Sequence, residues 1–142
     1  MNSPGKGESR PERRTLAELA AGEVLGPITV SVSAAANERY WRSAGVDHPL
    51  LAAGALYPPI AANLTILLLQ TAVPGPVLHA RQRLTCHRRG SAAEEGTALG
   101  VSGSVAARYE KRGREYAEVE ATVSLPDGSV LWTSQATFAE AR

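Results

Sequence analysis

One stretch decides the fold of this chain: Tyr57-Pro58-Pro59-Ile60-Ala61-Ala62-Asn63-Leu64-Thr65-Ile66-Leu67-Leu68-Leu69-Gln70-Thr71-Ala72-Val73. Proline near a helix start is favourable, because its missing N–H is one that the first turn leaves unpaired. From Ile60 onward the residues are mostly Ala, Leu and Ile, and Pro74-Gly75-Pro76 then ends the helix. Apolar side chains occur on nearly every side, so we expect this helix to be buried nearly all round. At roughly 15 residues it is too short to span a bilayer.

The residues after Pro76 have the two-residue period of strands instead of the helical period. Clean alternation over successive strands is typical of an antiparallel sheet with one packed face. The expected fold class is therefore α+β, an antiparallel sheet wrapped around a long buried central helix. The pattern predicts strands over 28–32, 77–88, 99–109, 117–125 and 130–138, and a small helix over 34–44 capped by Ser33. In the runs over 99–109 and 130–138, the residues expected to face inward include Ala107, Tyr109, Val130, Trp132, Ala136 and Phe138, with Leu131 outward.

Length and composition suit one domain. The chain has 142 residues and a net charge of +1, so no strong field draws it to nucleic acid or to a membrane. We expect residues 15–142 to form the domain and residues 1–14, rich in Gly, Pro and charge, to be a disordered lead-in. Cys86 is the only cysteine, which excludes a disulfide within the chain and a cysteine-rich metal site. A cytoplasmic location is expected, and a metal site is not.

Four segments carry a resemblance to a known family, and their order and spacing matter more than any one of them. They are Gly22-Glu23-Val24-Leu25-Gly26-Pro27, Tyr40-Trp41-Arg42-Ser43-Ala44-Gly45-Val46-Asp47-His48-Pro49, Leu78-His79-Ala80-Arg81-Gln82 and Tyr109-Glu110-Lys111-Arg112-Gly113-Arg114-Glu115-Tyr116. Over roughly residues 16–140 the chain resembles the MaoC-like hydratases and dehydratases, hot-dog-fold proteins that act on acyl thioesters. The resemblance implies a single hot-dog domain that dimerises, no cofactor, and a substrate carrying coenzyme A or phosphopantetheine.

The loop before the central helix departs from the family's catalytic pattern. Catalytic members carry D-x-N-P-x-H there, and the Asp and His hold the water that is added to, or lost from, the β-carbon. When the family's proline is aligned with Pro49, Val46 takes the place of the Asp and Leu51 that of the His. Neither side chain can transfer a proton, and Pro58-Pro59 replaces the usual His-Gly. The chain therefore resembles the non-catalytic member of a MaoC-type pair, which implies a homodimer or a heterodimer with a catalytic hot-dog chain.

Asp47 and His48 are the candidate catalytic residues of this loop. A carboxylate and an imidazole could share general acid and base work. Adjacent side chains on an extended loop point in opposite directions, however, so these two would rarely converge on one proton. The alternative is an Asx-type turn before Pro49 with His48 exposed. Whether the chain is an enzyme stays open at this point.

The start of the central helix supplies the first candidate substrate-binding residues, which are Tyr57, Pro59, Ile60 and Asn63. Backbone N–H groups at a helix N-terminus can donate to a carbonyl oxygen, although Pro59 has no N–H to give. Asn63 is the polar exception in an apolar helix. As a buried amide it would need a partner, either a loop backbone group or the acyl tunnel. Tyr57 would form a wall of the acyl site or pack the small helix against the sheet.

The second candidate group, Arg81 and Arg83, lies on the strand that follows the helix. Guanidinium groups suit the phosphates of coenzyme A or phosphopantetheine through bidentate geometry. The alternatives are a solvated outer face or a polar ledge where two protomers meet. Alternation along the strand assigns one face to His79, Arg81, Arg83, Thr85 and His87, and places Cys86 on the other face as a small core residue.

Three functions fit these observations, and the sequence leaves them open. The first is a non-catalytic or acyl-binding subunit of an enoyl hydratase or hydroxyacyl dehydratase, a lyase, in fatty-acid, polyketide or steroid side-chain metabolism. The second is an acyl-CoA thioesterase with relocated catalytic residues. The third is an acyl-thioester binding module. The missing Asp and His favour the first and the third.

Overall fold

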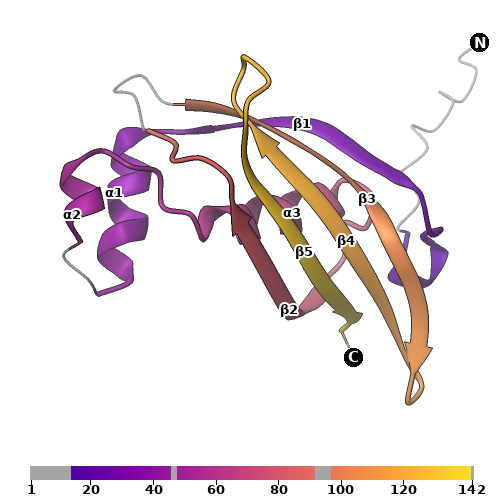
Figure 1. Cartoon of the computed structure of the whole chain (residues 1–142). Coiled ribbons are helices and arrows are strands. Elements are labelled where there is room, and N and C mark those ends of the chain that lie inside the picture. The colour runs from indigo at the N-terminus through magenta and orange to yellow at the C-terminus, as the bar shows by residue number, and fades with distance from the viewer. Residues whose placement is uncertain (1–13, 46–47, 92–96, 142) are drawn as a thin grey trace, which may run out of the picture.

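A five-stranded antiparallel sheet curves around one helix in the computed structural model, which describes residues 14–45, 48–91 and 97–141 (Figure 1). The strands lie in the order β1-β3-β4-β5-β2. The elements are η1 (Leu16–Glu18), β1 (Val24–Val32), α1 (Ala34–Ser43), α2 (Pro49–Ala52), α3 (Ile60–Gln70), β2 (Val77–Cys86), β3 (Thr97–Lys111), β4 (Arg114–Ser124) and β5 (Val130–Glu140). The expected α+β class and the antiparallel sheet around a central helix are both confirmed.

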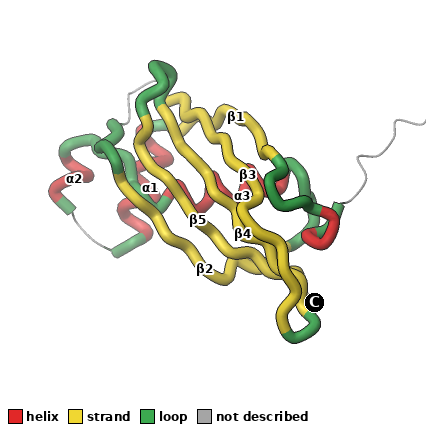
Figure 2. Tube along the Cα trace, turned by 45° about the vertical axis from the view of Figure 1, so that its right-hand side comes forward, coloured by secondary structure: helices red, strands yellow, loops and turns green. Residues whose placement is uncertain are grey.

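The central helix α3 lies across one face of the sheet and contacts all five strands. In Figure 2 it crosses behind the sheet, whose near face carries no helix among the described residues. Its buried residues are Ile60, Ala61, Leu64, Thr65, Leu68 and Leu69, and they pack against the inner side chains of the strands. This contact forms the core of the domain.

The expectation that α3 is buried nearly all round is wrong. Leu67 is 44% exposed, and Asn63 and Gln70 are exposed as well. These positions follow one another at spacings of four and three residues, so they form one stripe along the helix. The sheet covers only the opposite side of α3, which leaves this stripe open in a single chain.

β-Bulges reverse the expected facing of several strand residues. A register shift between Val105 and Ala107 turns Tyr109 to the outer face, where it is 37% exposed, although alternation had placed it inward. A second shift near the start of β5 buries Leu131 completely and leaves Val130 37% exposed, the reverse of the expectation. An extra residue in one strand exchanges its two faces beyond that point.

Candidate functional site

Two side chains of α1 position the segment that leads into the central helix. The Asn37 amide nitrogen donates to the Ala55 carbonyl at 2.9 Å, and its oxygen accepts from the Tyr57 N–H at 2.8 Å. Trp41 Nε1 donates to the same Ala55 carbonyl at 2.8 Å. Asn37 is only 3% exposed, so its amide is a buried and fully used anchor. Sequence reasoning missed Asn37, although its spacing of four residues from Trp41 places both on one helix face.

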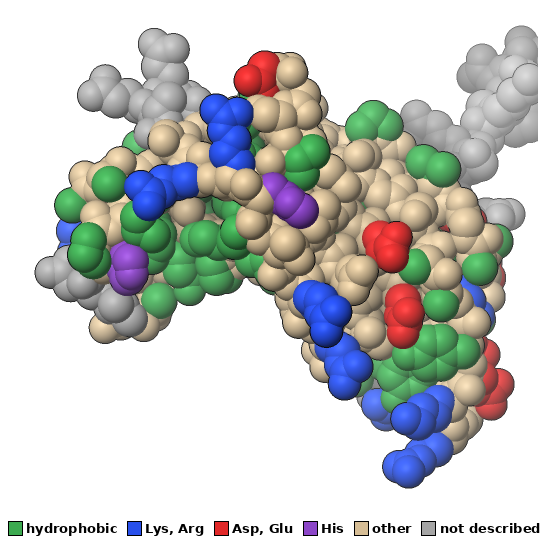
Figure 3. All heavy atoms as spheres, in the orientation of Figure 1, with side chains coloured by type: hydrophobic (Ala, Val, Ile, Leu, Met, Phe, Trp, Pro, Cys, Tyr) green, Lys and Arg blue, Asp and Glu red, His purple; other side chains and the backbone are tan. Residues whose placement is uncertain are grey.

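An aromatic cluster occupies the N-terminal end of α3. Tyr57 stacks on Tyr40 with ring centroids 6.2 Å apart, and meets Trp41 edge-on at 5.0 Å. The Asn63 amide donates to the Tyr40 hydroxyl at 3.3 Å. Asn63 is exposed, so the expectation of a buried amide is wrong, and its partner is a side chain of α1 instead of a loop backbone group. Figure 3 shows hydrophobic side chains lining the hollow between the lobe of α1 and α2 and the body of the sheet.

His48 makes two contacts that hold its side chain in place, one through Nδ1 and one through the face of its ring. Its Nδ1 accepts from the Leu50 N–H at 3.1 Å, which caps the short helix α2. Its ring stacks on Trp41 at a centroid distance of 5.4 Å. A neutral His48 therefore carries its proton on Nε2. The other candidate catalytic residue, Asp47, and the neighbouring Val46 lie outside the described residues.

The backbone donors at the start of α3 already have acceptors. The N–H groups of Ile60, Ala61 and Ala62 donate to the carbonyls three residues earlier, each at 3.0 Å. Ile60 is 2% exposed, whereas Pro59 is exposed and has no N–H. A thioester oxygen at this helix end would have to compete with those carbonyls for every donor.

Arg81 and Arg83 lie on the outer face of the sheet, away from the aromatic cluster. The register of β2 shifts between His79 and Arg81, which pairs His79 with Phe138 but Arg81 with Thr137. His79 stacks on the buried ring of Phe138 at 5.1 Å and so belongs to the inner face. The expectation that His79 shares a face with the two arginines is therefore wrong. The bulge has the same effect here as in β3 and β5.

The inner face of β2 is poorly covered, because this strand lies at the edge of the sheet. Cys86 is exposed, so the expectation of a small core residue is wrong. Gln82, which pairs with the inner residue Ala136, is only half-buried, whereas Leu78 pairs with Ala139 on the outer face and is 46% exposed. The open stripe of α3 and the open inner side of β2 are thus parts of the same uncovered helix side of the domain.

A shallow hollow of about 540 Å³ lies beside the two arginines on the outer face. The residues that line it include Arg81, Arg83, Glu118, Glu120, Gln135 and Thr137. Sequence reasoning had not connected the arginines with the two carboxylates, which belong to β4. The pKa of Tyr109, beside the hollow, is raised by burial and by the charge of Glu118, while the charge of Arg81 opposes the rise. The Tyr109 ring stacks on Tyr116 at 5.3 Å, and Figure 3 shows basic and acidic side chains on this face.

The structure thus divides the expected substrate site into two places. Tyr57, Ile60 and Asn63 lie at one end of α3, where Tyr57 and Asn63 both contact Tyr40, whereas Arg81 and Arg83 lie on the opposite face of the sheet. The described residues contain no group of three His, Cys, Asp or Glu side chains arranged to hold a metal ion. Within the same residues, no helix is long and apolar enough to cross a membrane.

The arrangement of one helix wrapped by a curved antiparallel sheet, entered from a small helical lobe, is the hot-dog fold. No family model matches the sequence, and no curated protein does. Solved structures do match. The HadBC (3R)-hydroxyacyl-ACP dehydratase complex of Mycobacterium tuberculosis has a TM-score of 0.69 at 16% identity, over 84% of this chain and 96% of that one.

Two further structures have the same fold. The (R)-hydratase of A. caviae involved in PHA biosynthesis has a TM-score of 0.69 at 17% identity, over 87% of this chain and 98% of its own. The ChsH1–ChsH2 complex of Mycobacterium tuberculosis has a TM-score of 0.59 at 14% identity, over 86% and 98%. The hot-dog fold expected from the resemblance is confirmed, in the form that these hydratases and dehydratases have. HadBC and ChsH1–ChsH2 are each a complex of two named chains.

Proposed function

We propose that this chain is a MaoC-like hot-dog subunit that binds an acyl thioester and does not catalyse hydration or dehydration alone. The state of the loop before α3 carries the proposal. Leu51 takes the position of the family's His, and His48 Nδ1 is used to cap α2 at 3.1 Å. The N–H groups of Ile60 and its two successors are bonded within the chain. Acid–base groups typically contribute 10²–10⁴-fold to the rate of an enzyme, and an oxyanion donor contributes about 10²–10³-fold. A chain that lacks both should therefore hydrate enoyl thioesters at a rate close to background.

The hollow at the N-terminal end of α3 is the proposed acyl site. Tyr57 and Tyr40 offer half-buried aromatic surface, and Asn63 holds the Tyr40 hydroxyl at 3.3 Å. Pro59 and Ile60 complete the rim where the helix begins. The substrate would carry coenzyme A or phosphopantetheine as its carrier group, and a second hot-dog chain would supply the Asp and His. The exposed Cys86 thiol suits a reducing cytoplasm.

Binding and turnover should be measured separately on the isolated chain. Calorimetry with a medium-chain enoyl-CoA should detect binding, while the enoyl absorbance should stay constant after mixing. Asn63→Ala and Tyr57→Ala should weaken binding, whereas Gln70→Ala, an exposed position two turns further along the same stripe, should not. Steady turnover that is lost in His48→Ala would contradict the proposal and favour an enzyme with relocated residues.

A partner test completes the experiment. Activity should appear when the chain is purified together with a second hot-dog chain that has an intact D-x-N-P-x-H loop. Tight ester binding with no activity in any such pair would instead favour a stand-alone binding module.

A further inference from the structure

The β2 edge of the sheet offers a further strand a longer run without register shift or proline than the β1 edge does. β1 has a register shift between Leu25 and Ile28, and Pro27 within it cannot donate a hydrogen bond. β2 pairs with β5 without interruption from Arg81 to Cys86, and it contains no proline. A regular strand with one neighbour presents unpaired N–H and C=O groups along its free side.

Apolar surface on the helix side adjoins this edge. Leu67 on α3 is 44% exposed on the helix side, and α3 contacts β2. A chain that added its own strand to β2 and laid a helix beside α3 would cover Leu67. The edge and this apolar surface therefore fit a protein partner of the same fold, which depends on the dimer in the proposed function.

The outer face of the same edge carries two arginines that have no ion-pair partner among the described residues. Arg81 and Arg83 are exposed, and neither forms a hydrogen bond or an ion pair within the described residues. The carboxylates of Glu118 and Glu120 line the same hollow but belong to β4, two strands away, with β5 between. Two strand spacings amount to roughly 10 Å at the backbone.

A second copy of this chain would meet that charge at a two-fold axis. When two identical antiparallel strands pair, a two-fold centred on Arg81, Gln82 or Arg83 places an arginine directly opposite an arginine. Directly opposed side chains have Cβ atoms about 4.5–5.5 Å apart, and like charges there are destabilising. A two-fold centred on Leu84 leaves Arg83 diagonal to its own copy, roughly 7–8 Å away.

We propose that Arg81 and Arg83 select a different hot-dog chain as partner, one whose edge strand carries carboxylates on its outer face, and that they disfavour a homodimer. Each guanidinium would then form a charge-assisted pair across the new strand junction. Sequence reasoning assigned these arginines to the phosphate of the thioester. Two observations favour the partner strand, namely that the arginines flank the open edge and that they lie on the face opposite the acyl site.

Charge reversal tests the inference with this chain alone. Sedimentation equilibrium at low salt should find the wild type monomeric, with association rising as added salt screens the arginines. In the pairing centred on Gln82, Arg81→Glu places a carboxylate opposite Arg83 of a second copy, so it should lower the homodimer dissociation constant by roughly tenfold or more. The double variant Arg81→Glu with Arg83→Glu should be monomeric again. Arg39→Glu makes the same charge change at an exposed site on α1 and should behave like the wild type.

Mixing provides the decisive measurement, because the double variant imitates an acidic partner. An equimolar mixture of wild type and double variant should form heterodimers at low salt, and Cys86 should then react more slowly with a thiol reagent. A wild-type homodimer as tight at low salt as at high salt, or a mixture that stays monomeric, would overturn the inference.

The phosphate alternative has its own outcome. If the double variant loses affinity for a coenzyme A ester while association ignores the charge pattern, the arginines contact phosphate and the inference is wrong. Ester binding without turnover by the wild type would leave the proposed function intact in that case, so the two failures can be told apart.

Discussion

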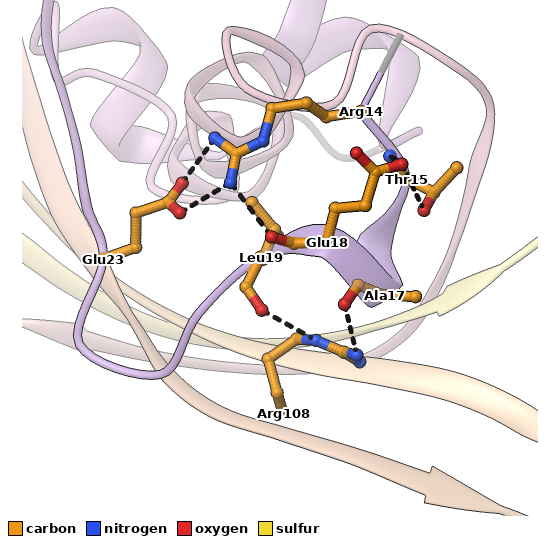
Figure 4. Close-up of polar contacts among 7 residues, drawn as sticks. All are labelled: Arg14, Thr15, Ala17, Glu18, Leu19, Glu23 and Arg108. Carbon is orange, nitrogen blue, oxygen red and sulfur yellow. Dashed lines mark hydrogen bonds and ion pairs between the residues drawn. The ribbon is translucent and has the colours of Figure 1, made fainter. Parts of the chain in front are cut away.

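Arginines at the two sides of the sheet have opposite surroundings. On the β1 side, Arg108 donates to the carbonyls of Ala17 and Leu19 at 2.9 and 3.1 Å, to that of Tyr116 at 2.8 Å, and to the Glu115 carboxylate at 2.9 Å (Figure 4 shows the first two). On the β2 side, Arg81 and its neighbour Arg83 are exposed and unpaired within the described residues.

The difference separates a structural arginine from available ones. Arg108 ties η1 to the sheet, and the Arg14–Glu23 ion pair at 2.6 Å holds the chain just before it (Figure 4). Arg14 is the one residue of the expected disordered lead-in that the structure describes; the others lie outside the described residues. Arg108 and Arg14 are thus used within the fold of their own chain, whereas Arg81 and Arg83 are available for another molecule.

The largest expected effect contrasts the two sides of α3. Leu68 is fully buried, so Leu68→Ala should lower the free energy of unfolding by about 2–5 kcal/mol through lost burial and a cavity. Leu67→Ala, at the 44% exposed neighbouring position, should cost less than about 1 kcal/mol in the isolated chain. Urea unfolding followed by circular dichroism measures both. Equal losses would show that the open stripe is covered in solution.

The next effect contrasts the arginines themselves. Arg108→Ala should lower the free energy of unfolding by about 2–4 kcal/mol, because it leaves carbonyl acceptors and the partly buried Glu115 carboxylate without their donor. Arg81→Ala should change it by less than about 0.5 kcal/mol. The same urea titrations compare them. A large loss in Arg81→Ala would mean that the β2 arginines also hold the fold together.

Sequence patterns predict the helices and strands well, but they predict less well which face of the sheet each strand residue occupies. The apolar run at 60–70, the Ser33 cap and the alternating strands all depend on neighbours along the chain, and each of these elements is confirmed. The errors at His79, Tyr109 and Leu131 each follow a register shift between paired strands. A bulge depends on how two distant strands fit together, and nothing in the local alternation marks it.

The candidate site was predictable only in part for a related reason. The aromatic and helix-start residues were identified because they lie close together in the sequence. Asn37 was missed because its partners, Ala55 and Tyr57, are 18 and 20 residues away. The separation of the arginines from the aromatic cluster depends on the bulge in β2, so it too required the structure.

The smallest expected effect concerns the Arg14–Glu23 ion pair and its pH dependence. The hydrogen bond from Arg14 holds the pKa of the Glu23 carboxyl below its ordinary value, against the effect of burial. Because the folded-state pKa is the lower one, the unfolded chain takes up the proton first as pH falls. The stabilisation is therefore present above the ordinary glutamate pKa of about 4.3 and is lost below it. Both side chains are partly exposed, so solvent reduces the effect.

Urea midpoints of wild type and Glu23→Gln should differ most at pH 7 and converge by about pH 3, and added salt should narrow the difference between the two midpoints. Asp127, whose pKa is also lowered, through its Ser129 partner, titrates equally in both proteins and cancels in the difference. A gap that is constant with pH would mean that Arg14 does not hold the Glu23 carboxylate in solution.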